Sequence, residues 1–160
     1  MSGSLLTLLR SLAASQVEHV VIGGMAGVLQ GVPVVTADLD FVHRRSPDNV
    51  ARLLALLSDI QAVFRGDPRA LGPSEHHLTG HGHLLLATRL GPLDLLCEVA
   101  GQGYEELVPD SLILQIGEGL AVRVVTLEKL IALKRTAGRP KDLLALPTIE
   151  ATRDELRRRK

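Results

Sequence analysis

Apolar residues recur along the chain with two periods, which predict different elements. Helical spacing of leucines predicts an amphipathic helix over residues 4–15, with Ser4 as its N-cap. Further helices are expected over 25–30, 46–58 and 126–138, and a final helical region from Lys141 onward. Short β-branched or alternating runs bounded by glycine, proline or polar residues indicate strands. These runs cover residues 18–22, 37–43, 62–64, 83–90, 93–99, 112–116 and 120–125.

The order of these elements is helix, strand, helix, strand, helix, then mostly strands, then helices. Such an order favours an α+β fold, in which a mixed β-sheet is flanked by helices. Residues 66–82 are rich in glycine and proline and are expected to form a loop. The chain has no internal repeat and no long linker. We therefore expect one domain over residues 1–147, followed by a basic C-terminal helix or tail over residues 148–160.

The 160 residues carry 18 basic and 18 acidic side chains, a formal net charge of zero that excludes a uniformly basic nucleic-acid coat. The two signs are unevenly placed. Residues 1–122 hold 13 acids and 7 bases, a net −6, and residues 123–160 hold 5 acids and 11 bases, a net +6. Three aromatic residues leave little for stacking bases. No apolar run approaches the roughly 18 residues of a membrane span, so we expect a cytoplasmic protein without a membrane partner.

The sharpest chemical feature is the sequence Asp38-Leu39-Asp40. In a strand, side chains two residues apart project from the same face, so both carboxylates would lie on one side and Leu39 in the core. Two carboxylates this close together repel each other, and a cation bound between them would offset the repulsion. Mg²⁺ prefers carboxylate oxygens as ligands. A solvated pair on an edge strand is the alternative interpretation.

Two further features favour a metal site over a solvated pair of acids. Gly23 and Gly24 stand between a predicted strand and a predicted helix, where glycine allows an anionic ligand to approach the backbone. A tight turn without a ligand is the alternative for the glycines. Asp94 lies within an apolar strand, where a carboxylate needs a partner or a metal. Three acids on neighbouring strands beside a phosphate-binding turn favour phosphoryl transfer with two metal ions.

These segments resemble a known family. Residues 21–31, followed by Thr36 and the Asp-x-Asp stretch within residues 36–42, resemble the signature of DNA polymerase beta-type nucleotidyltransferases. Within that superfamily they are most similar to small bacterial proteins related to the abortive-infection nucleotidyltransferase toxins. Residues 133–143 resemble the downstream helix of that group, with its Lys and Arg-x-Lys-Asp pattern. Together the matches frame residues 17–146.

The resemblance implies a role for each matching residue. Asp38, Asp40 and Asp94 would ligate magnesium, with two ions expected, and Asp94 would also accept the proton of the acceptor hydroxyl. The nucleotide would be bound by residues from both motifs. These residues are Gly23, Gly24, Thr36, Lys134, Arg139 and Lys141, of which Lys134 would also be catalytic. Two positions depart from many relatives, which carry an arginine where this chain has Val34 and an acid where it has Ala145.

The resulting expectation is a magnesium-dependent nucleotidyltransferase. It would transfer a nucleoside monophosphate from a nucleoside triphosphate to a hydroxyl of RNA, such as tRNA, of a protein or of a small molecule. The alternative is a weak or inactive nucleotide-binding member of a toxin–antitoxin pair, with a toxin or antitoxin as its partner. A third hypothesis is modification of an aminoglycoside-like antibiotic. It ranks lower because the chain has no acidic domain for a polycation.

Other residues offer competing chemistry. His76, His77, His81 and His83 fall within eight residues, a density that suits either a zinc or nickel site or a polar loop near the active site. The polar loop is favoured because the helical His-x3-His pattern of zinc proteases is missing. Cys97 is the one cysteine and is expected to be a buried thiol. The basic run 157–160 is expected to be a solvated terminus, with an RNA contact as the alternative.

Overall fold

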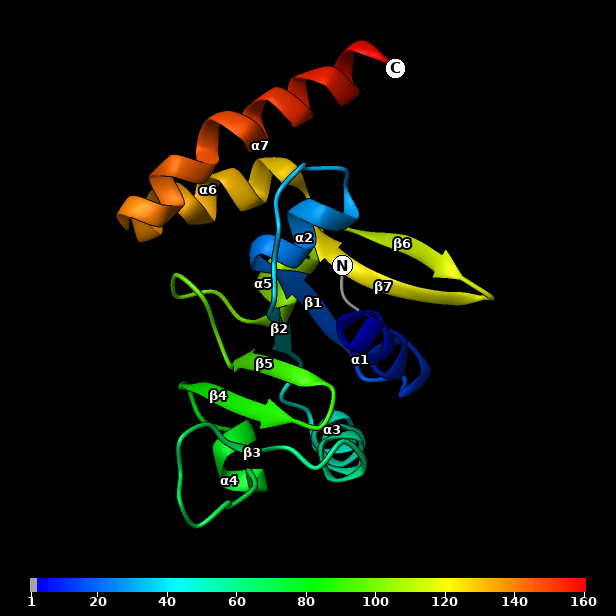
Figure 1. Ribbon diagram of the computed structural model, residues 1–160, viewed down its shortest axis with the longest axis vertical. Coiled ribbons are helices and arrows are strands. Elements are labelled where there is room, and N and C mark those ends of the chain that lie inside the picture. The colour runs from blue at the N-terminus through cyan, green and yellow to red at the C-terminus, as the bar shows by residue number, and fades with distance from the viewer. Residues whose placement is uncertain (1–2) are drawn as a thin grey trace.

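A seven-stranded mixed sheet forms the centre of the molecule (Figure 1), as seen in a computed structural model that describes residues 3–160. Its strands are β1 (His19–Ile22), β2 (Leu39–His43), β3 (Val63–Phe64), β4 (His83–Thr88), β5 (Gly91–Leu96), β6 (Ser111–Gly117) and β7 (Leu120–Val125). The order across the sheet is β3-β4-β5-β2-β1-β7-β6. The pairs β2–β5 and β1–β7 are parallel and the others antiparallel. The mixed sheet expected from the sequence is confirmed.

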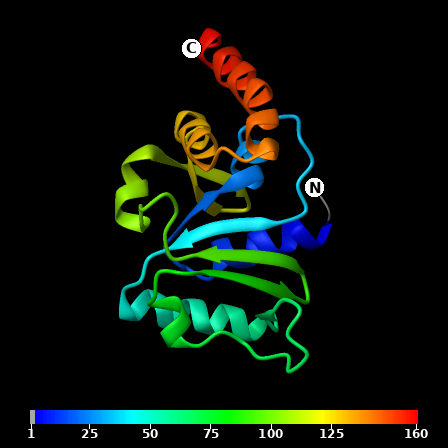
Figure 2. The ribbon, with the colours of Figure 1, turned by 90° about the vertical axis from the view of Figure 1, so that its left-hand side faces the viewer.

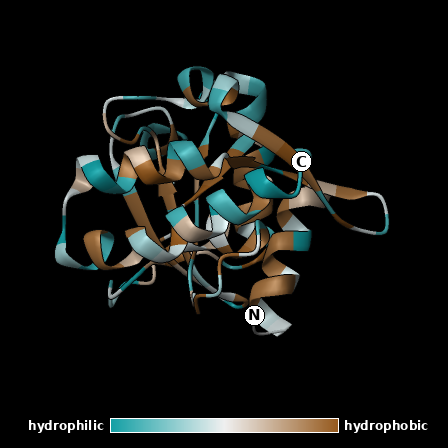
Figure 3. Ribbon diagram, turned by 90° about the horizontal axis from the view of Figure 1, so that it is seen from above, coloured by the Kyte–Doolittle hydropathy of each residue, from teal (hydrophilic) through white to brown (hydrophobic). Residues whose placement is uncertain are grey.

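Helices surround this sheet. They are α1 (Gly3–Ala14), α2 (Gly23–Leu29), α3 (Pro47–Asp59), α4 (Glu75–Leu78), α5 (Tyr104–Leu107), α6 (Leu127–Ala137) and α7 (Pro140–Arg158), with a 3-10 turn at Val108–Asp110. The α6–α7 pair lies at one end of the molecule, and α3 and α4 lie at the other (Figures 1 and 2). The β6–β7 hairpin projects to one side (Figure 3). In the described part of the chain, no helix combines the length and apolar character needed to traverse a bilayer.

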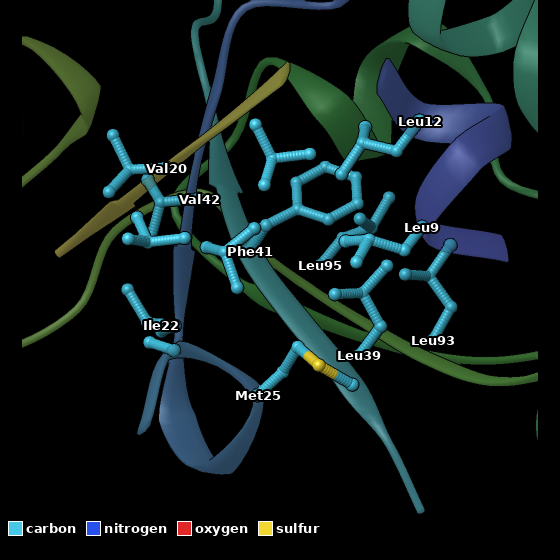
Figure 4. Close-up of a cluster of buried hydrophobic side chains, with 14 of the residues drawn as sticks. Leu9, Leu12, Val20, Ile22, Met25, Leu39, Phe41, Val42, Leu93 and Leu95 are labelled. Atoms are coloured by element: carbon cyan, nitrogen blue, oxygen red, sulfur yellow. The ribbon is translucent and has the colours of Figure 1, made fainter. Parts of the chain in front are cut away.

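One part of the core lies between α1 and one face of the central strands (Figure 4). Alternate residues of β2 and β5 are buried there against two leucines of α1. The residues concerned are Leu39, Phe41, Leu93, Leu95, Leu9 and Leu12, each at most 1% exposed. Because the side chains of a strand alternate between its two faces, this packing places Asp40 and Asp94 on the opposite face.

Several helix ends agree with the sequence. The Thr126 side chain accepts a hydrogen bond from the Lys129 N–H (3.1 Å) and caps α6, whose other end is Gly138 in the left-handed conformation (φ +64°). Pro47 stands in the first turn of α3. Ser4, by contrast, lies inside α1 and is not its N-cap, because the described helix already includes Gly3.

Other boundaries differ from the expectation. Gly23 and Gly24 form the first turn of α2 itself and do not precede the helix. Pro92 lies within β5, which antiparallel pairing with β4 extends to Gly91. The segment 66–82 is not wholly a loop, since α4 lies within it, and no pattern indicated the four-residue helix α5. Such short helices carry too little periodicity to be read from sequence.

Helix α7 is continuous from Pro140 to Arg158, so the expected boundary after residue 147 falls within a helix that also contains Pro147. The division into a domain and a basic tail stays a prediction. Near the C-terminus, Arg157 forms an ion pair with Glu128 of α6, and Arg158 pairs with Glu155 at 2.8 Å. The basic run is therefore exposed but partly neutralised by acids of the same two helices.

A buried amide ties the start of β1 to the end of β2. The side chain of Asn49, in the first turn of α3, is fully buried. Its Oδ1 accepts from the Glu18 N–H at 2.6 Å, and its Nδ2 donates to the Glu18 and Arg44 carbonyls at 3.0 and 2.7 Å. One side chain thus satisfies backbone groups of both segments.

We expect Asn49→Ala to lower the free energy of unfolding by about 3 kcal/mol, because it leaves buried backbone groups without partners. Urea denaturation followed by circular dichroism measures this loss. Arg52→Ala, at an exposed position of the same helix, is the control and is expected to change stability by about 0.5 kcal/mol or less. Equal losses in the two variants would contradict this account of Asn49.

Candidate functional site

Three aspartates meet on the sheet face opposite the α1 core. Asp40 of β2 stands directly beside Asp94 of β5 in the parallel pairing, and Asp38 immediately precedes β2. Each side chain offers one carboxylate oxygen, and these oxygens all lie within 4.8 Å of one another. Within residues 3–160, no other group of three His, Cys, Asp or Glu side chains gathers in this way. The three acids that the sequence singled out are thus brought together.

Asp40 is the most perturbed member of this cluster. Burial, followed by the negative charges of Asp94 and Asp38 and a hydrogen bond with Asp94, raises its pKa to about 7, against the partial opposition of Lys134. Its Oδ1 atom is buried and has no hydrogen-bond partner. A divalent cation would both satisfy this oxygen and offset the repulsion. The three side chains therefore fit a hard metal ion of the Mg²⁺ type.

The two glycines lie against the segment that carries the acids. Gly23 has φ +67°, and a Cβ there would overlap the Asp40 Oδ2 atom. A Cβ on Gly24 would lie 3.1 Å from the Thr36 hydroxyl oxygen, and that hydroxyl donates to the Asp38 carbonyl at 3.3 Å. Both glycines thus allow α2 to approach the Asp-x-Asp segment closely. This contact needs no ligand, so their expected role on a phosphate stays a prediction.

Basic side chains from α6 and from the start of α7 lie opposite the three acids. Lys134 Nζ is 3.6 Å from Asp142 Oδ1, and Arg139 Nε donates to Asp142 Oδ2 at 2.7 Å. The Asp142 side chain is buried, and the hydrogen bond from Arg139 holds the pKa of its carboxyl below the usual value. Asp142 therefore fixes two of the cations that the sequence assigned to the nucleotide.

A cavity of about 560 Å³ separates the acidic and basic groups. The site residues predicted from the sequence that line it are Gly23, Asp38, Asp40, Asp94, Lys134, Arg139 and Lys141. Leu85, Leu96 and Leu133 contribute apolar wall. Gly24 and Thr36 lie against each other and do not line it, and neither do Val34 and Ala145. Three acids from residues 1–122 therefore face three bases from residues 123–160 across one cavity.

The four histidines do not form a shared metal site among the described residues, since only the aspartate cluster reaches three ligands. His77 Nδ1 accepts the Ser74 N–H at 3.0 Å and helps to cap α4. His81 lies 3.4 Å from Glu98, and His83 lines the cavity. His76 and His77 belong to α4 and His83 begins β4, so the polar-loop interpretation holds for His81 alone.

Sequence reasoning missed two residues of the site. Asp142 is the last residue of the Arg-x-Lys-Asp pattern. A single acid among bases was the available signal that it pairs with them. Arg65 donates from Nη2 to Asp94 Oδ1 at 2.6 Å, although 29 positions separate the two residues in the sequence. Arg65 gave no signal, because only the pairing of β3, β4 and β5 brings the two side chains together.

Comparisons with known proteins agree with this geometry at the level of the fold. No protein-family model and no curated protein matches the sequence. A proposed nucleotidyltransferase of Thermotoga maritima is similar in structure, with a TM-score of 0.55 and 17% identity over 96% of this chain and 91% of that chain. The two proteins share a fold. The α+β nucleotidyltransferase fold expected from the sequence is therefore confirmed.

A second solved structure is less similar. It is a proposed nucleotidyltransferase of H. pylori, with a TM-score of 0.41 and 15% identity over 81% of this chain and 54% of that chain. At these identities, neither likeness tests the expected relationship to the abortive-infection toxins.

The contact between Gly23 and Asp40 can be tested by substitution. We expect Gly23→Ala to lower the free energy of unfolding by about 3 kcal/mol, because the new Cβ overlaps a carboxylate oxygen and the backbone has positive φ. Gly31→Ala is the control, since Gly31 also has positive φ (+93°) but open space around it, and about 1 kcal/mol is expected there. Chemical denaturation measures both, and an equal cost would argue against the overlap.

The raised pKa of Asp40 predicts a pH dependence of stability. Between the ordinary pKa of 3.8 and the folded value of about 7, the folded state holds the proton more tightly, so stability falls as pH rises through this window. We expect Asp40→Asn to stabilise the metal-free protein by up to about 4 kcal/mol at pH 8 and by little at pH 4. Urea denaturation in EDTA at both pH values checks this, and a gain independent of pH would contradict it.

Proposed function

We propose that this chain is a divalent-cation-dependent nucleotidyltransferase of the DNA polymerase beta type. It transfers a nucleoside monophosphate from a nucleoside triphosphate to a hydroxyl group and releases pyrophosphate. The observation that supports it best is the cluster of Asp38, Asp40 and Asp94 facing basic residues across one cavity. A triphosphate with its cations has the charge and size to bridge these two walls.

Asp38, Asp40 and Asp94 are the residues that would hold the metal, with two Mg²⁺ ions in this proposal. When bound, the ions would neutralise charge that develops on the phosphates. Lys134, with Arg139 and Lys141, would bind the triphosphate and stabilise the leaving pyrophosphate. Gly23 would allow the phosphates to approach the backbone, and Gly24 and Thr36 would support that turn.

In the transfer step, the acceptor oxygen forms a bond to the α-phosphorus, and the bond from that phosphorus to the oxygen bridging the α- and β-phosphates breaks. The electron pair of the broken bond leaves with pyrophosphate. The proton of the acceptor hydroxyl passes to the Asp94 carboxylate. The partial burial of the three acids keeps them in a region where their charges interact more strongly than in water.

The acceptor in this proposal is a hydroxyl of RNA, including tRNA, of a protein or of a small molecule. A kinship with the abortive-infection toxins would make a protein antitoxin the natural partner. One observation favours the alternative of a nucleotide-binding protein with little turnover. Asp142 already engages Lys134 and Arg139, so these cations would have to exchange that partner for phosphate.

Transfer can be tested with α-labelled nucleoside triphosphates and Mg²⁺, offered together with tRNA, cell protein and aminoglycosides as acceptors. We expect label to reach one acceptor class, and the double variant Asp38→Ala with Asp40→Ala to lose at least about a thousandfold in rate. Asp59→Ala, which removes an exposed acid at the end of α3, is the matched control and should retain the rate.

Label transfer that survives the double substitution would refute the assignment. Calorimetry separates the two candidate functions. Mg²⁺-dependent nucleotide binding without transfer to any acceptor would support the alternative of a binding protein.

A further inference from the structure

We propose that Arg65 is a positioning residue for Asp94. It holds one oxygen of this carboxylate and leaves the other oxygen for the cavity, and its charge competes with a bound cation. This inference rests on the proposed function, because it assigns to Asp94 a role in ion binding and transfer. It adds a residue from outside the two sequence motifs.

The path of the Arg65 side chain crosses a strand. Arg65 follows β3, and its N–H donates to the Leu85 carbonyl of β4 at 2.9 Å. Its guanidinium then extends past β4 to β5, where Nη2 donates to Asp94 Oδ1 at 2.6 Å. Leu85 lies opposite Asp94 in the β4–β5 register, so the arginine reaches the acid across the intervening strand.

The guanidinium is also fixed by the backbone. The same Nη2 atom donates to the Leu86 carbonyl at 2.9 Å, and the preceding residue, Phe64, is held by its N–H to the Leu71 carbonyl at 2.8 Å. Leu86 belongs to β4, which is paired on both sides. The arginine is therefore held in place by contacts that do not involve Asp94, as expected of a residue that positions this aspartate.

Two consequences follow for the aspartate cluster. The contact fixes the rotamer of Asp94, which stands directly beside Asp40 in the β2–β5 pairing. The positive charge offsets part of the repulsion among the three acids, and by the same Coulomb interaction it disfavours a metal cation beside Asp94. Loss of Arg65 should therefore affect ion affinity and transfer in opposite directions, whereas local damage to the structure would weaken both.

The test is Arg65→Gln in the full chain, measured with Mn²⁺ as the ion probe. We expect the Kd for Mn²⁺ by calorimetry to fall about threefold or more, because a neighbouring positive charge is gone. We expect kcat for label transfer to fall about tenfold or more with little change in the KM for nucleotide, because Asp94 is no longer held in place. Arg69→Gln is the matched control, since Arg69 lies in the same segment and pairs with Asp67.

Two further variants sharpen the result. In the Asp94→Asn background, Arg65→Gln should cause no further fall in kcat, because no carboxylate is left for the arginine to hold. For Arg65→Ala, millimolar guanidinium should restore part of the lost transfer, which would not happen if the role were merely structural. A Kd for Mn²⁺ that is unchanged or higher in Arg65→Gln would overturn the inference, even if transfer falls.

The failures of the two proposals can be told apart. Wild-type protein that binds Mn²⁺ while Arg65→Gln binds it no more tightly refutes the role of Arg65 alone. Wild-type protein that neither binds Mn²⁺ nor transfers label refutes the proposed function, and the role of Arg65 with it. If wild-type protein binds Mn²⁺ but transfers no label, the comparison of its Kd for Mn²⁺ with that of Arg65→Gln decides the role of Arg65.

Discussion

Parallel pairing of β2 with β5 is the constraint on which the site depends. It sets Leu39 beside Leu93 and Asp40 beside Asp94, so that burial of the leucines against α1 forces the two acids together on the other face. The hydrophobic gain of the core thus maintains an electrostatically unfavourable pair. The acids cannot separate without disturbing the strand pairing that buries the leucines.

The surrounding elements relieve that repulsion in different ways. Gly23 gives Asp40 room, Arg65 binds Asp94, and Lys134 supplies a positive charge from α6. Asp142 in turn holds Lys134 in place. The basic side chains of α6 and α7 therefore balance acids at the sheet, and three acids from the acidic part of the chain face three bases from its basic part across one cavity.

Much of this arrangement could be predicted from particular residues. Alternation around Leu39 indicated that the Asp-x-Asp acids share a face, and Thr126 and Gly138 marked the ends of α6. The exact start of α2 and the helices α4 and α5 could not be predicted. Short elements are set by tertiary contacts more than by periodicity. The contact of Arg65 with Asp94 depends on the order of three strands, which local patterns do not contain.

The sequence by itself determined most of the element types, much of the core and the chemical identity of the acids and bases, because periodicity and residue chemistry are local properties. Only the tertiary structure decided which of these residues meet. Strand pairing joined Asp40 to Asp94, packing placed Lys134 and Arg139 across the cavity, and Gly24 was left outside its lining. Such contacts are non-local, so burial and pairing over the whole chain had to be known before the site could be described.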